Sequence, residues 1–201
     1  VEKLKITDGG SLSKNLNALI SSDFVIKYVP FGFGKREEHY KLIDLFCIFY
    51  LHFVENQKKT NEKFWQQNAT SASISAWRGF AFENVCFHHV EQIKYALGIP
   101  AVITETSAWS KKEDDTEGVQ IDLLITRNDN VINMCEIKYY SGPFKVDKEY
   151  YAKILGRQTI LSEKVSPKTS IHSTLITTFG LADNEYSSAF VNTVTLEDLF
   201  R

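Results

Sequence analysis

The sequence has few cysteines, no long apolar run and no segment that resembles a signal peptide. Three cysteines, Cys47, Cys86 and Cys135, lie far apart in 201 residues, which excludes a disulfide framework and indicates reduced thiols in the core of a cytoplasmic protein. No apolar run approaches the roughly 18 residues that a membrane span requires. We therefore expect a cytoplasmic location and no membrane partner.

A nucleotide-binding loop and an excess of positive charge are also missing. The pattern G-x-x-x-x-G-K-[ST] does not occur, and the run Gly32-Phe-Gly34-Lys35 lacks the Ser or Thr and leads toward a strand. We expect no ATP site in this chain. A formal net charge of −2 gives no global support for nucleic-acid binding, although a local basic patch can coexist with an acidic surface elsewhere.

The chain does contain enough apolar residues to build a core. Its content of 43% hydrophobic and 13% aromatic residues is far from that of a disordered protein. A length of 201 residues suffices for one large or two small domains. We divide the sequence into a first segment (1–56), a polar linker (57–76) and a main domain (77–201).

The main domain is organised around a predicted β-hairpin. The apolar runs from Val119 to Thr126 and from Val131 to Tyr139 flank a short Asn/Asp turn, which is typical of two antiparallel strands. Both runs are too apolar for half-exposed strands, so we expect central strands covered on both faces. The charged segment before them, 110–118, is predicted to be a solvated loop.

Charged side chains inside such strands require partners. Glu136 and Lys138 project to one side of the second strand, and Gln120 and Asp122 share a side of the first. Two carboxylates on neighbouring strands form a hard oxygen site of the kind that binds Mg²⁺ or Mn²⁺. An ammonium group beside it can orient a water and balance charge on a phosphoryl group. An ion pair between the strands explains the same residues, and spacing alone leaves both explanations open.

Asp122, a hairpin turn and then Glu136-Ile-Lys138 resemble the signature of the PD-(D/E)XK nuclease superfamily. In that signature an acidic residue on one strand precedes Glu-x-Lys on the next. The resemblance extends from about Trp77 to the C-terminus, in the order helix, three strands, helix and strand, with Ile121 where the family name has Pro. It implies an α/β fold with a restriction-endonuclease-like mixed sheet flanked by helices, and metal-dependent phosphodiester hydrolysis on DNA or another nucleic acid.

The resemblance also implies a role for each site residue. Glu83 matches a glutamate that points toward the metal from the first helix of the domain. Glu83, Asp122, Glu136 and the backbone carbonyl of Ile137 would hold one or two Mg²⁺ (or Mn²⁺) ions. Lys138 would position the attacking water and offset charge at the phosphorus, with Asp122 and Glu136 completing the catalytic set.

Two helices bear on this site. A helix from Trp77 to Leu97 places Glu83 inside an apolar stripe, where a pair with Lys94 is the alternative to a role at the metal. Asp147 is predicted to cap a second helix, which reaches about residue 164. On it, Arg157 and Gln158 could approach the site. Some nuclease-like families place a glutamine there, which makes Gln158 an accessory candidate, although a surface role is the simpler explanation for it. Gln120, which shares a face with Asp122, is the other accessory candidate.

The first segment has the pattern of the second half of a winged helix. A helix (12–22) precedes two strands (24–29 and 38–42) and a further helix (43–56). Four basic residues lie on or near the wing: Lys27, Lys35, Arg36 and Lys41. They are candidates for phosphate contacts on nucleic acid, and a winged helix used only for packing, with solvated charges, explains them equally well.

A partial winged helix followed by a nuclease-like domain resembles the C-terminal portion of a family of prokaryotic AAA-type ATPases. The first helix of the winged helix is missing, so we expect a part of a longer protein. The expected partners are nucleic acid, DNA in particular, and an N-terminal ATPase domain of the same parent protein. Two alternatives remain open: a catalytically silent module that binds DNA or a partner within an ATPase, and a structural domain with internal salt bridges.

Overall fold

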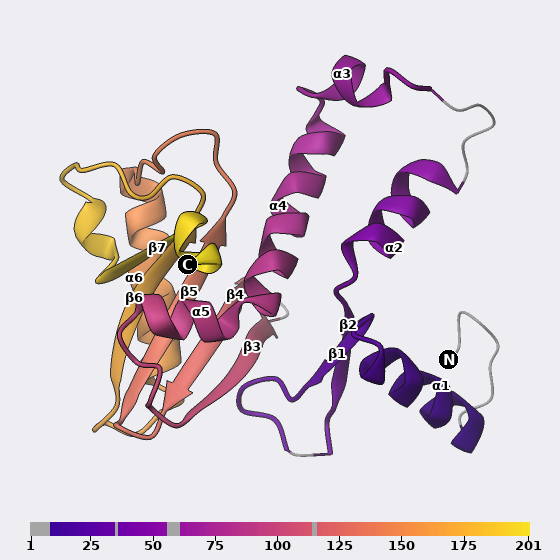
Figure 1. Cartoon of the computed structure of the whole chain (residues 1–201). Helices are drawn as coiled ribbons and strands as arrows, with labels where there is room; N and C mark the ends of the chain where they lie inside the picture. The colour runs from indigo at the N-terminus through magenta and orange to yellow at the C-terminus, as the bar shows by residue number, and fades with distance from the viewer. Residues whose placement is uncertain (1–8, 35, 56–60, 114–115) are drawn as a thin grey trace.

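The computed structural model describes residues 9–34, 36–55, 61–113 and 116–201. A mixed sheet with helices on both faces forms the larger part, and a small antiparallel hairpin lies in the N-terminal part (Figure 1). This arrangement confirms the predicted α/β class, with a mixed sheet flanked by helices. None of the helices in the described ranges is long and apolar enough to cross a membrane.

The sheet has five strands within the described part of the chain: β3 (Thr104–Glu113), β4 (Thr116–Arg127), β5 (Val131–Lys138), β6 (Ser170–Thr177) and β7 (Asn192–Thr195). Strands β3, β4 and β5 form an antiparallel meander, and β6 and β7 are added in parallel to β5. The helix α6 (Lys148–Ser162) connects β5 to β6, as a parallel pair requires a crossover. Short 3-10 turns at Ser187–Ala189 and Glu197–Phe200 flank β7.

The hairpin of β4 and β5 forms where the sequence predicted it. Asn130 in the turn has a φ of 63°, a left-handed conformation that asparagine tolerates better than most residues. One face of the sheet packs against α6 and the other against α4 (Ala72–His88) and α5 (Val90–Ala96). Both central strands are therefore covered on two sides, as predicted. The free thiols of Cys86 and Cys135 are buried in the core, as predicted, whereas Cys47 is only half-buried.

The predicted single helix from Trp77 to Leu97 is wrong at its start and in its middle. Helix α4 begins at Ala72, inside the segment taken as a linker (57–76), because the Ser71 side chain accepts a hydrogen bond from the Ile74 N–H (3.3 Å). The linker also holds α3 (Phe64–Asn68), the short helix predicted there. At His89 the backbone leaves the helical region and separates α4 from α5.

The charged segment 110–118 is not the loop that the sequence predicted. Strand β3 continues to Glu113 and β4 begins at Thr116, with 114–115 outside the described residues. The prediction relied on the lack of apolar residues. Backbone pairing in a hairpin needs no apolar side chain, because the hydrogen bonds join main-chain groups.

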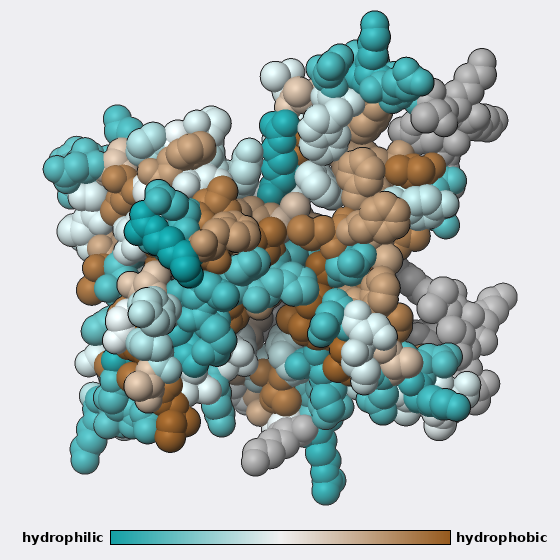
Figure 2. All heavy atoms as spheres, viewed as in Figure 1, coloured by the Kyte–Doolittle hydropathy of each residue, from teal (hydrophilic) through white to brown (hydrophobic). Residues whose placement is uncertain are grey.

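The N-terminal part contains the predicted helix, hairpin and second helix. They are α1 (Gly10–Ser21), β1 (Val25–Tyr28), β2 (His39–Leu42) and α2 (Leu45–Phe49), which continues as a π-helical turn over Tyr50–Val54. Figure 2 shows apolar side chains gathered over α2 on this face. Phe46 of α2 is 72% exposed, and Leu51 of the π-helical turn is 50% exposed. The winged-helix assignment of this segment stays a prediction.

Candidate functional site

A β-bulge in β4 lies at Asp122. Between two regular pairs of β4 with β3, Asp122 and Leu123 together face the single residue Ala108. The extra residue puts Ile121 and Leu124 in the same core cluster, whereas Leu123 packs in the other. Bulges redirect side chains and are frequent next to active sites. Asp122 still lines the same pocket as Gln120, and the bulge changes which face the residues after it occupy.

Asp122 is a carboxylate that holds its proton more tightly than usual. Its Oδ2 accepts a hydrogen bond from the Ile137 N–H (3.2 Å). Burial and the nearby Glu136 carboxylate raise the pKa of Asp122 to about 6, against the opposing effects of Lys138 and of the Ile137 N–H. No salt bridge to Asp122 is found among the described side chains. Desolvation combined with a specific like charge is typical of functional sites.

Glu136 is buried and fully engaged. It accepts hydrogen bonds from the Tyr150 hydroxyl and the Arg157 guanidinium of α6. The ammonium of Lys138, two residues along β5, lies 2.8 Å from its Oε1, which confirms that the two side chains share a face. The Arg157 side chain is 12% exposed and that of Lys138 is 37% exposed. Glu136 therefore has one enclosed cation and one that reaches solvent.

Sequence reasoning missed what Tyr150 and Arg157 do together. Arg157 was expected only to approach the site, and no role at the site was predicted for Tyr150. The two residues are seven positions apart, or two turns of α6, so they lie on one face of the helix. Asp147 caps the same helix by accepting a hydrogen bond from the Tyr150 N–H (2.8 Å), as predicted. The seven-residue spacing of these two polar side chains, on a helix that follows the strand with Glu136, is the signal that could have identified the pair.

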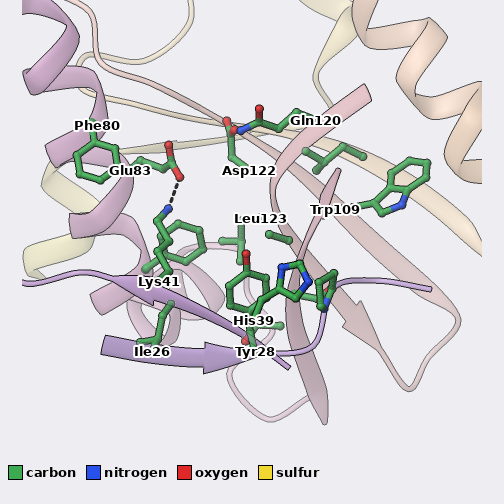
Figure 3. Close-up of a pocket in the computed structure, with 16 residues that line it drawn as sticks. Ile26, Tyr28, His39, Lys41, Phe80, Glu83, Trp109, Gln120, Asp122 and Leu123 are labelled. Atoms are coloured by element: carbon green, nitrogen blue, oxygen red, sulfur yellow. Dashed lines mark hydrogen bonds and ion pairs between the residues drawn. The ribbon is translucent and has the colours of Figure 1, made fainter. Parts of the chain in front are cut away.

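Glu83 projects from α4 and forms an ion pair with Lys41 of β2 (Figure 3). The Lys41 Nζ also lies 4.0 Å from the centre of the Phe87 ring, a favourable cation–π position. The alternative pair of Glu83 with Lys94 is wrong, because Lys94 binds Glu91 instead, at 3.0 Å. Lys41, assigned to the wing surface, thus points toward the main domain.

A pocket of about 450 Å³ lies between the N-terminal hairpin and the sheet. The hairpin is held there by the Phe31 N–H, which donates to the Ala108 carbonyl at the bulge (3.1 Å), and by contact of the Phe31 and Trp109 rings. Side chains that line the pocket include Tyr28, His39, Lys41, Glu83, Gln120 and Asp122 (Figure 3). The walls therefore come from both predicted segments, 1–56 and 77–201.

The remaining predicted residues lie apart from this centre. Lys27 is exposed and paired with Glu38 (2.8 Å), and Arg36 is exposed. Lys35 lies outside the described residues. Gln158 is half-buried on α6, whereas Gln120, the other accessory candidate, lines the pocket. Contacts of the wing with phosphate stay a prediction.

The carboxylates do not form a ready three-ligand cluster. No group of three or more His, Cys, Asp and Glu side chains in the described ranges is arranged to hold a metal ion, because Glu83 is turned to Lys41 and Glu136 to Arg157 and Lys138. The oxygen donors nevertheless suit a hard cation. The raised pKa of Asp122 reflects its burial first and then the Glu136 charge, which Lys138 offsets only in part, and a bound cation would balance that charge. Asp122 and Glu136 thus offer oxygen donors of the kind that Mg²⁺ or Mn²⁺ accepts, and metal binding by these residues and Glu83 stays a prediction.

Comparison with known proteins adds little to this geometry. No protein-family model matches the chain, and no curated protein matches it. A crystal structure described as that of a protein of unknown function, AF1548, is similar over 57% of this chain, with 13% identity and a TM-score of 0.39. The matched part spans 64% of that chain.

The raised pKa of Asp122 predicts a distinct pH dependence of stability. Between its ordinary value of 3.8 and about 6 the folded state binds more protons at Asp122 than the unfolded state does, so the free energy of unfolding falls as the pH rises through this interval. In metal-free buffer at about pH 8, Asp122→Asn should raise stability by about 2–3 kcal/mol. Urea denaturation at several pH values measures this.

Asp129→Asn is the control for that experiment. Its exposed carboxylate has a lowered pKa because it binds Arg127, so its removal should give no gain above neutral pH. A loss of stability in Asp122→Asn at about pH 8 would contradict the burial and repulsion described for Asp122.

Proposed function

We propose that this pocket is the active site of a metal-dependent phosphodiesterase that hydrolyses nucleic acid, DNA in particular. The observation that carries the proposal is the environment of Asp122: a carboxylate at a β-bulge whose pKa is raised by burial and by the neighbouring Glu136. The Lys138 ammonium completes the group at the same end of β5. Asp122 lines the pocket, and the Glu136 carboxylate and Lys138 ammonium beside it influence its pKa. Two acids and an ammonium in this proximity have the chemistry that phosphoryl transfer requires.

Asp122 and Glu136 would hold the metal, together with the Ile137 carbonyl that the family resemblance implies. A bound Mg²⁺ or Mn²⁺ would lower the pKa of a coordinated water and stabilise charge on the phosphoryl oxygens. Lys138 would contact the attacking water or a phosphoryl oxygen, since its ammonium reaches solvent. Arg157 and Tyr150 are positioning residues that hold the Glu136 carboxylate and preserve its charge balance when Lys138 turns to the substrate.

The wider setting of this activity is part of the proposal. A nuclease-like domain behind a partial winged helix would serve an N-terminal ATPase domain of the same parent protein in the cytoplasm. The described hairpin lies against the main domain through Phe31 and Lys41. A hairpin in that position would adjust access to the pocket, because Lys41 holds one of the three acidic side chains.

The competing function is a catalytically silent module that binds nucleic acid or a partner. The observation in its favour is that Glu83 and Glu136 are both engaged in ion pairs, as internal salt bridges would be. The two functions differ in metal affinity. A silent module would show no saturable Mn²⁺ binding that depends on Asp122.

Lys41→Met should strengthen Mn²⁺ binding by about tenfold, because it releases the Glu83 carboxylate from an internal cation (a tenfold change corresponds to about 1.4 kcal/mol). Calorimetric titration of Mn²⁺ into both chains measures the effect. Lys27→Met is the control, since Lys27 belongs to the same hairpin but pairs with Glu38 at the surface. Equal affinities of the Lys41→Met chain and the unaltered chain would show that Glu83 takes no part in the metal site.

A further inference from the structure

We propose that the pocket receives an unpaired nucleobase, which makes single-stranded nucleic acid the substrate class. The proposal rests on the proposed function in one respect, because it places the backbone of the bound strand near Asp122. It rests otherwise on the walls of the pocket, on its polar groups and on the charges of the hairpin.

Aromatic side chains line the pocket both from the hairpin and from α4. Tyr28 and His39 line it from the hairpin, with ring centres 5.9 Å apart in an edge-on contact, and Phe80 and Phe87 line it from α4. The Phe80 side chain remains 38% exposed. A volume of about 450 Å³ lies in the range of small-molecule sites. Aromatic rings of this kind offer surfaces on which a flat ring, such as a nucleobase, can stack.

Polar groups on the opposite wall can contact the edge of a base. Gln120 and Asp122 line the pocket from the sheet, whereas Tyr28 and His39 line it from the hairpin (Figure 3). The Gln120 amide offers both a donor and an acceptor to the edge of a base. Stacking on one side and hydrogen bonds on the other are the two means by which proteins read an extruded base.

A base in an intact duplex cannot enter such a pocket, because it is stacked between neighbours and paired along its edge. Two of the lysines on the hairpin are also paired within the molecule and do not offer a free charge to the phosphates of a duplex. Lys27 is bound to Glu38 and Lys41 to Glu83, so two of the four cations predicted for phosphate contacts are neutralised within the molecule. Affinity that depends on phosphate requires free cations. Stacking of unpaired bases therefore suits this surface better than the backbone of a double helix.

The test is fluorescence anisotropy with a short labelled oligodeoxythymidine and with a blunt duplex of equal length, using the Asp122→Asn chain so that no hydrolysis interferes. The single strand should bind at least about tenfold more tightly than the duplex. Tyr28→Leu and Phe80→Ala should each weaken single-strand binding by about tenfold, since each removes a stacking surface. Tyr28→Phe should retain binding, which separates loss of the ring from loss of the fold.

Tyr95→Ala is the control substitution, because Tyr95 is an aromatic residue of α5 that is 75% exposed. Equal affinity for the two nucleic acids, or unchanged binding in both Tyr28→Leu and Phe80→Ala, would overturn the base pocket. Cleavage assays with the chain that retains Asp122 separate this result from the proposed function. Cleavage that is insensitive to both aromatic substitutions overturns the base pocket alone, and ring-dependent binding without cleavage supports the pocket and overturns hydrolysis.

Discussion

Glu136→Gln should lower the free energy of unfolding by about 3 kcal/mol, the largest stability effect expected from one substitution in the site. The change keeps the size of the side chain but leaves the enclosed Arg157 guanidinium without a counter-charge and the Tyr150 hydroxyl with a weaker acceptor. Removing one member of a buried pair costs more than the pair contributes, because the remaining charge stays desolvated. Urea denaturation in metal-free buffer at neutral pH measures the loss.

Two further variants make this result specific. Glu149→Gln changes an exposed acid on α6 and should alter stability by less than about 0.5 kcal/mol. The double variant Glu136→Met with Arg157→Met should recover much of the loss, because it removes both charges together. A loss well below 1 kcal/mol in Glu136→Gln would contradict the enclosed pair with Arg157. It would also remove the basis for treating Arg157 as the residue that holds Glu136.

Lys138→Met should reduce hydrolysis by about a hundredfold or more while leaving the fold intact. The rate should fall because Lys138 is the one cation of Glu136 that reaches solvent. A group that acts on the attacking water or on phosphoryl charge typically contributes about a hundredfold or more to the rate. The fold should stay intact because the Lys138 side chain is 37% exposed and Arg157 still neutralises Glu136. Initial cleavage rates with Mn²⁺ and thermal unfolding test the two expectations.

Lys153→Met serves as its control, since Lys153 is an exposed lysine on α6. It should change neither rate nor unfolding. Hydrolysis that persists in Lys138→Met at the rate of the Lys153→Met control would contradict a catalytic role for Lys138. A large loss of stability in Lys138→Met would indicate instead that the ammonium serves the fold through Glu136.

The fold followed from the sequence where local pattern and pairing agree. Two apolar runs around Asn130 predicted β4 and β5, and the predicted helices cover the two faces of the sheet. The bulge at Asp122 was not predictable, because it arises from the register between β4 and β3 rather than from the pattern of either strand. The extension of β3 to Glu113 was missed for a related reason, since main-chain pairing leaves no mark on hydropathy.

The sequence predicted only those site residues whose positions are set by their own strand or helix. Asp122, Glu136 and Lys138 are recognisable because their spacing along two strands sets their faces. The partners that define their electrostatics are tertiary. Lys41 and Glu83 are 42 positions apart, and no pattern in either segment predicts their ion pair. The sequence also did not predict that the hairpin forms a wall of the pocket. The two segments have the pattern of separate domains, and the hydrogen bond from Phe31 to the bulge that joins them is a tertiary contact.

The most direct measurement is cleavage of a labelled single-stranded DNA in Mn²⁺ by the unaltered chain and by Asp122→Asn, each purified in the same way. We expect cleavage products with the unaltered chain, none in the presence of a chelator, and a rate at least about a hundredfold lower with Asp122→Asn. Circular dichroism should show both chains equally folded. No cleavage by the unaltered chain, or equal cleavage by Asp122→Asn, would contradict metal-dependent hydrolysis at this site.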